Sequence, residues 1–104
     1  MKRERGKLPT FLKRYFWDVS FAQLRLRRSR TFVLERILEY GDQRAVRWMD
    51  EQFDRRAIRE TVARSQRLSV RSANFWASLY NLRRPEVRCL SKRFQQRRRQ
   101  HWLA

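Results

Sequence analysis

Residues 29–82, SRTFVLERILEYGDQRAVRWMDEQFDRRAIRETVARSQRLSVRSANFWASLYNL, decide the fold. Four small polar residues in this stretch, Ser29, Asp42, Asp54 and Ser69, each precede apolar residues at helical spacing. Their side chains can accept a hydrogen bond from the free backbone N–H groups in the first turn of a helix. We therefore predict four consecutive helices, each beginning after one of these residues.

The apolar residues define the buried face of each predicted helix. The first helix buries Val33, Leu34, Ile37 and Leu38 and ends at Tyr40-Gly41, where Gly41 is expected to adopt a left-handed backbone. The second buries Ala45, Val46, Met49 and Phe53, and the third has Ala57, Ile58, Thr61 and Val62 on one side. The fourth buries Val70, Ala73, Trp76, Ala77 and Tyr80 and ends at Asn81.

The flanking sequence predicts two further helical segments. Pro85-Glu86 suits the first turn of a fifth helix, because proline there gives up no helical hydrogen bond. Phe11–Trp17 predicts another short helix, with a tight turn at Phe16-Trp17-Asp18. Only two Gly and two Pro occur in 104 residues, which disfavours a turn-rich β fold. The sequence thus predicts an all-α fold, a compact bundle of about five short helices spanning residues 10–90.

The charge is strongly positive. There are 27 basic residues, 23 of them Arg, against ten acidic residues, which leaves a net charge of +17. Much of the excess lies at the ends, which predicts a basic extension at 1–9 and an Arg-rich, helical tail at 91–104. The electrostatic field of a protein with this net positive charge attracts polyanions.

Residues 55–82 have the spacing of a helix-turn-helix, two helices joined at residues 65–68. The second helix of this motif presents residues near its N-terminus to the major groove of DNA. The candidate base contacts are Arg67, Arg71, Ser72 and Asn74, since Arg pairs with guanine and Asn with adenine. An ordinary helical hairpin with a solvated polar face would show the same spacing.

The tail offers a second candidate contact. Arg-rich segments neutralise phosphates and release counterions. The candidate phosphate contacts are Lys92, Arg93, Arg97, Arg98 and Arg99, and Phe94 and Trp102 could stack on unpaired bases. Alternatively, Val87, Leu90 and Phe94 continue an apolar stripe onto the core, and the arginines form a solvated face.

No catalytic constellation is visible in the sequence. One His and one Cys cannot build a zinc site. Some carboxylates recur at helical spacing, but arginines lie beside them and would form salt bridges with them. We expect a protein that is not an enzyme and has no cofactor, metal or small-molecule substrate. The longest uncharged stretch, residues 72–82, is shorter than the roughly 20 residues of a membrane span, so we expect no membrane partner. We also expect a cytoplasmic location. Cys89 is expected to lie in the core.

Several segments resemble a small bacterial family of unknown function, whose pattern is FWD, then ERVLEYGD, then LS..T.NFW. The resemblance covers about residues 10–90. The matching segments here are Phe16-Trp17-Asp18, Glu35 to Asp42 (ERILEYGD) and Leu68-Ser69 with Ala73-Asn74-Phe75-Trp76. Members of that family are often encoded beside a nucleotidyltransferase toxin of the abortive-infection type. The resemblance implies an antitoxin or an accessory component of a two-gene module, with such a toxin as a possible partner.

Three functions follow as hypotheses. The first is a nucleic-acid-binding protein, an antitoxin-like or accessory regulator that contacts DNA in preference to RNA. The second is a protein-interaction module that neutralises a partner toxin without nucleic acid. The third is an RNA-binding subunit of a ribonucleoprotein that uses the tail.

Overall fold

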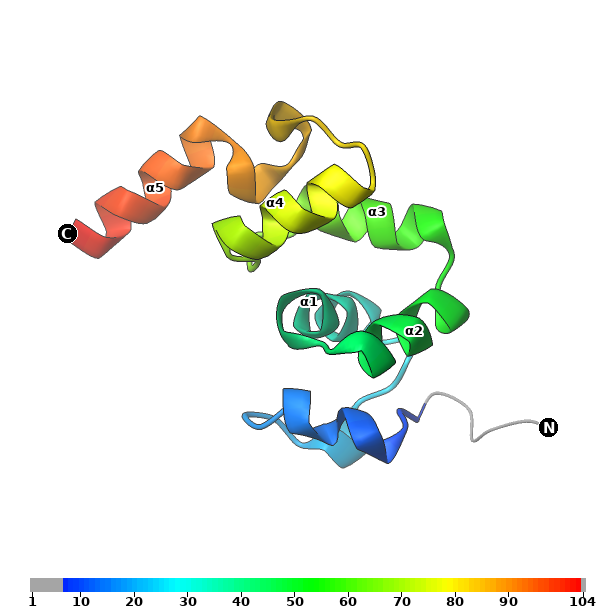
Figure 1. Cartoon of the computed structure of the whole chain (residues 1–104). Helices are drawn as coiled ribbons and strands as arrows, with labels where there is room; N and C mark the ends of the chain where they lie inside the picture. Colours follow the sequence, from blue (N-terminus) through cyan, green and yellow to red (C-terminus); the bar gives the residue numbers. More distant parts are fainter. Residues whose placement is uncertain (1–6, 104) are drawn as a thin grey trace. The chain divides into compact units, whose positions relative to one another are not determined.

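The computed structural model of the chain describes residues 7–103, with side chains up to residue 99, and divides into two helical units. The N-terminal unit is Met1–Gln52 and the C-terminal unit is Phe53–Ala104 (Figure 1). No strand occurs within residues 7–103, and five α-helices are present there, so the all-α prediction is confirmed. Most of the predicted extension 1–9 lies outside the described residues.

Over its described residues, 7–52, the N-terminal unit contains two short 3-10 helices and two α-helices. They are η1 (Thr10–Tyr15), η2 (Phe21–Gln23), α1 (Arg30–Tyr40) and α2 (Gln43–Gln52). Helix α1 packs against both α2 and η1. Its predicted apolar face is buried, and it forms a core with Leu12, Phe16, Ala45 and Met49. Asp42 begins α2 as predicted, because its Oδ1 accepts the N–H of Ala45 at 3.0 Å.

Four predictions in this unit are wrong or need correction, the fourth of them at Gly41. Segment Phe11–Trp17 is a 3-10 helix that ends at Tyr15, although the tight turn follows as predicted, with the N–H of Val19 donating to Phe16 O at 3.5 Å. Ser29 is not a side-chain cap, because its Oγ accepts the N–H of Arg25 on the preceding turn. Val46 is only half-buried.

Gly41 was expected to be left-handed, and this is wrong, because its φ is −67° and its ψ is 145°. The reason for glycine here is space. A Cβ at this position would lie 2.7 Å from Ile37 O and 2.9 Å from Ile37 Cγ2. Glycine therefore lets the chain leave α1 and enter α2 against the last turn of α1.

Arg36 connects the FWD and ERILEYGD segments. Its guanidinium donates to Asp18 Oδ2 at 2.7 Å and to Tyr15 O at 3.0 Å, and it lies 4.7 Å from the centre of the Trp17 ring. The exposed Trp17 ring meets Tyr40 edge to face, with 5.2 Å between ring centres. Two motifs far apart in sequence thus form one clamp, named the Arg36 clamp below.

Hydrogen bonding lowers the pKa of two carboxyl groups in this unit. The pKa of Asp18 is lowered mainly by the hydrogen bond from Arg36. The pKa of Asp42 is lowered mainly by the N–H of Ala45 at the start of α2. Both carboxylates therefore hold the fold together in their charged form.

The C-terminal unit contains α3 (Arg55–Arg64), α4 (Val70–Leu79), η3 (Arg84–Glu86), η4 (Arg88–Leu90) and α5 (Lys92–Leu103). In Figure 1 the chain runs out along α3 and returns along α4, and the two helices are in contact. Asp54 and Ser69 begin these helices as predicted, accepting the N–H of Ala57 at 2.8 Å and of Ser72 at 3.1 Å. Asn81, where the fourth helix was predicted to end, follows α4 with a φ of 57°.

Two predictions in this unit are wrong, and a third is confirmed. The segment at Pro85-Glu86 is not a fifth α-helix, because η3 and η4 are separate 3-10 turns and the next α-helix begins at Lys92. Val70 is 39% exposed rather than buried. Cys89 is buried as expected, and its thiol donates to Ser65 O at 3.1 Å.

Among the helices of residues 7–103, none combines the length and the apolar character that crossing a bilayer requires.

Candidate nucleic-acid interface

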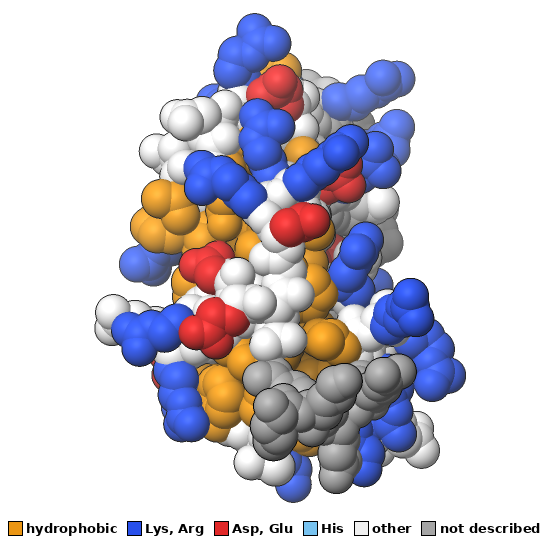
Figure 2. Space-filling model, turned by 90° about the vertical axis from the view of Figure 1, so that its right-hand side faces the viewer, with side chains coloured by type: hydrophobic (Ala, Val, Ile, Leu, Met, Phe, Trp, Pro, Cys, Tyr) orange, Lys and Arg blue, Asp and Glu red, His pale blue; other side chains and the backbone are white. Residues whose placement is uncertain are grey.

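Positive charge is concentrated in the C-terminal unit. This unit has 14 basic and three acidic residues, a net charge of +11, whereas the N-terminal unit has 13 basic and seven acidic residues, a net charge of +6. Thirteen of the 14 basic side chains in the C-terminal unit are exposed, and Arg98 is half-buried. Figure 2 shows one face of the molecule, from which many Lys and Arg side chains project and on which several acidic side chains lie among them. Three carboxylates cannot neutralise 14 cations, so this unit can bind a polyanion.

The α3–α4 pair places two predicted base contacts in solvent. Arg67 is exposed in the connection between the helices, and Arg71 is exposed in the first turn of α4. Ser72 is half-buried, and its N–H is taken by the Ser69 cap. Arg71 is thus better placed than Ser72 to reach a ligand.

Asn74 is exposed on α4 but holds a partner within the unit. Its Oδ1 accepts a hydrogen bond from Arg84 Nη1 at 2.8 Å. Adenine recognition by asparagine needs both the amide oxygen and the amide NH₂. An amide oxygen can accept two hydrogen bonds, so Arg84 competes with adenine for Asn74 without excluding it. Release of Asn74 would leave Arg84 able to bind a phosphate.

The outer face of α4 also carries large apolar side chains, which sequence reasoning missed. Phe75 is 59% exposed and Leu79 is 53% exposed, one helical turn apart. Their spacing from Arg71 (four and eight residues) was the available signal, because it places all three on one side of the helix. Such a face can contact thymine methyl groups or the surface of a protein.

The exposed side of α3 carries Arg55, Arg56 and Arg59, which were not among the candidate contacts predicted from sequence. Arg55 lies 4.9 Å from the centre of the Tyr80 ring, and Arg59 Nε donates to Tyr80 O at 3.3 Å. Arg56 forms an exposed ion pair with Glu60, with 3.8 Å between Nε and Oε2. Two of these arginines are thereby oriented by the end of α4.

The tail residues lie on α5, which extends beyond the α3–α4 pair in Figure 1. Lys92, Arg93, Arg97 and Arg99 are exposed. Phe94 is half-buried, with the guanidinium of Arg98 5.0 Å and that of Arg88 5.7 Å from its ring centre. Arginines thus already stack on the ring predicted to stack on bases, and the side chain of Trp102 lies outside the described residues.

Two other kinds of site, a metal site and a cavity beside η3, are not supported as further ligand sites by the described residues. Within them, no group of three or more His, Cys, Asp or Glu side chains comes together in a way that could hold a metal ion. A shallow hollow of about 510 Å³ lies beside η3 and is lined by Arg64, Arg88, Ser91 and the carboxylate of Glu86. Its mixed charge gives no preference for an anion.

Comparison with known proteins gives one match. Residues 11–62, half of the chain, match a family of unknown function (DUF6922). No curated protein and no solved structure matches the chain. The matched segment contains the whole Arg36 clamp and ends within α3. The chain belongs to the family of unknown function DUF6922.

Proposed function

We propose that this protein binds DNA through its C-terminal unit, with the α3–α4 pair at the bases and the arginines of α5 on phosphates. The observation that carries the proposal is the net charge of +11 on this unit, borne by side chains that are nearly all exposed. Phosphate contacts supply most of the affinity of such a protein, and base contacts supply its specificity.

DNA is favoured over RNA because the candidate base contacts lie on a helix. Arg71 is in the first turn of α4 and Asn74 is in the second. The major groove of B-DNA admits an α-helix, whereas the deep, narrow major groove of A-form RNA does not. The connection at residues 65–69 leaves the start of α4 accessible, since Arg67 and Arg71 are both exposed.

In its biological setting we propose an antitoxin-like or accessory regulator, which is what the family resemblance implies.

The apolar face of α4 favours a second candidate function, a module that binds a partner protein. Phe75 and Leu79 are more than half exposed and lie one helical turn apart, so together they form an apolar patch that a partner protein could cover.

The test is a salt titration of binding to duplex DNA. If about six phosphates are neutralised, the slope of log K against log salt should be near −5. Arg71→Ala should cost about 1–3 kcal/mol on a preferred site and little on random DNA. Absence of binding at low salt would refute the proposal and leave the protein-binding alternative.

A further inference from the structure

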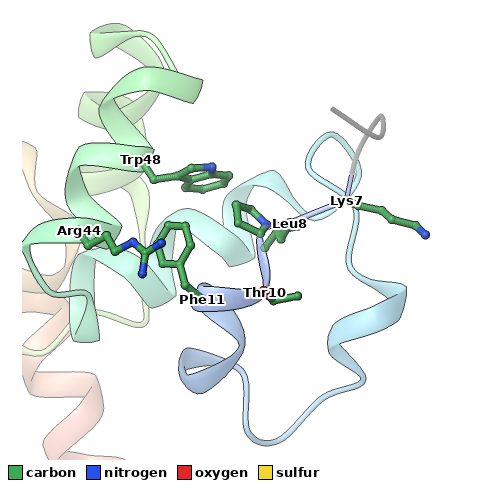
Figure 3. A pocket seen from close by; sticks show the side chains of 7 residues that line it. Lys7, Leu8, Thr10, Phe11, Arg44 and Trp48 are labelled. Atoms are coloured by element: carbon green, nitrogen blue, oxygen red, sulfur yellow. The ribbon is translucent and has the colours of Figure 1, made fainter. Parts of the chain in front are cut away.

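A pocket in the N-terminal unit lies outside the interface described above. It has a volume of about 660 Å³ and lies between α2 and the segment that leads into η1 (Figure 3). Pockets that hold small organic ligands are commonly about 300–1,000 Å³. Six of the residues that line it are labelled in Figure 3: Lys7, Leu8, Thr10, Phe11, Arg44 and Trp48.

The pocket combines flat rings with positive charge. The Arg44 guanidinium lies 4.0 Å from the centre of the Phe11 ring, and both side chains point toward one another in Figure 3. Trp48, one turn further along α2, forms the neighbouring wall and is 6% exposed. Lys7 projects outward at the other end of the pocket. None of the described residues that line the pocket is acidic, unlike the hollow beside η3.

This combination is suited to a ligand that has a flat ring and a negative charge. A guanidinium that stacks on a phenyl ring has its other face available for a second ring, and arginine stacks readily on aromatic systems. The hydroxyl of Thr10 can donate to or accept from the polar edge of a base. The positive charge of the Arg44 guanidinium also attracts an attached phosphate.

We infer that this pocket takes an unpaired nucleotide from the DNA, with its base against the Arg44–Phe11 pair. The inference rests on the proposed function, because it names the form of nucleic acid that the protein prefers. The C-terminal unit binds the duplex, and the pocket binds a base that has left the stack. The preferred substrate is therefore a duplex that carries a single-stranded segment.

The experiment compares two DNA molecules with the full-length protein. One is a blunt duplex of about 16 base pairs, and the other is the same duplex with a single-stranded overhang of about four nucleotides. Stacking of a base on an aromatic side chain is worth enough to make the overhang duplex bind about tenfold more tightly. Fluorescence anisotropy at fixed salt measures both affinities, and their ratio is the readout.

Two variants test the pocket against a matched control. Arg44→Gln removes the charged, stacking group, and Phe11→Leu keeps an apolar side chain but removes the ring. Both should bring the ratio close to one. Arg47→Gln removes another exposed arginine from the same helix, outside the pocket, and should leave the ratio near tenfold.

A measurement on the unmodified protein guards against a variant that fails to fold. The indole N–H signal of Trp48 should move in a nitrogen–proton spectrum when a single strand of about four nucleotides is added. A stationary Trp48 signal, or a tenfold ratio that survives both pocket variants, would overturn the inference. Equal binding of both duplexes would overturn it while leaving the proposed function intact. Failure to bind either duplex would refute the proposed function itself.

Discussion

At the scale of single residues, Gly41 illustrates how the physical role of a residue can differ from its usual one. Glycine after a helix commonly supplies a left-handed backbone, but here the backbone is extended and any residue could adopt it. What excludes a side chain is the closeness of Ile37 and, at 3.2 Å from the missing Cβ, of Ala45. The requirement is therefore steric.

We predict that Gly41→Ala destabilises the fold by about 1–3 kcal/mol, the usual cost of forcing an extra carbon into a packed site. Thermal or denaturant unfolding measures the loss. Ser78→Ala, at an exposed position on α4, is the control and should change stability by less than about 0.5 kcal/mol. A Gly41→Ala protein as stable as the control would show that α1 and α2 can separate there without cost.

A second prediction at this scale concerns pH. Since the hydrogen bond from Arg36 lowers the pKa of Asp18 below its ordinary 3.8, Asp18 stabilises the fold fully above that value. The contribution is lost as the pH falls through the lowered pKa. Asp18→Asn should therefore reduce stability near neutral pH and flatten its decline in acid.

Melting temperatures from about pH 6 down to about pH 2 measure this difference. Asp42 retains its own lowered pKa in the Asp18→Asn variant, so some decline should remain. Parallel curves for the variant and the unmodified protein would contradict the role of Asp18 in the Arg36 clamp.

At the scale of helices, the start of each element depends on whether a side chain reaches the backbone. Ser69 and Ser29 precede α4 and α1 in the same way, but only Ser69 accepts an N–H from its helix. We predict that Ser69→Ala costs about 1 kcal/mol, the usual value of a cap, and that Ser29→Ala costs clearly less. Denaturant unfolding of both variants provides a matched pair, and equal losses would contradict the difference in capping.

The helices could largely be predicted from sequence, because caps and apolar spacing act over three or four residues. Asp42, Asp54 and Ser69 were identified in this way, and so were the buried faces of α1 and most of α4. The 3-10 turns at residues 84–90 could not be predicted. There the backbone follows the burial of Val87, Cys89 and Leu90, and the partner of Cys89 is Ser65, 24 residues away.

The candidate site was less predictable than the helices, because several of its contacts join residues that lie far apart in the sequence. Exposure of Arg71 follows from the face of a helix, so its position could be anticipated. The hydrogen bond between Asn74 and Arg84 and the stack of Arg44 on Phe11 join separate segments. Local spacing contains no information about such pairs.

At the scale of the whole molecule, the uneven charge of the two units predicts an uneven contribution to binding. Changing Arg97, Arg98 and Arg99 to Gln should flatten the salt slope by about three units, one for each lost phosphate contact. The control changes Arg27, Arg28 and Arg30 to Gln, three exposed arginines of the N-terminal unit. That control should alter the slope by less than one unit, although it removes the same net charge.

Salt titrations of DNA affinity and melting curves for both triple variants complete the comparison. Equal flattening in the two variants would mean that net charge, rather than its location in the C-terminal unit, governs binding. A lowered melting temperature only in the tail variant would assign a packing role to Arg98, which lies over Phe94.

The burial of Cys89 has a practical consequence for labelling chemistry. The chain has one cysteine, and its sulfur is fully shielded while the C-terminal unit stays closed. A thiol-specific reagent should therefore modify the native protein only at the rate at which that unit opens, and duplex DNA should slow the reaction if it binds there. An added surface cysteine, such as Ser78→Cys, would be labelled first, so a fluorophore can be attached at one chosen point without removing the natural thiol.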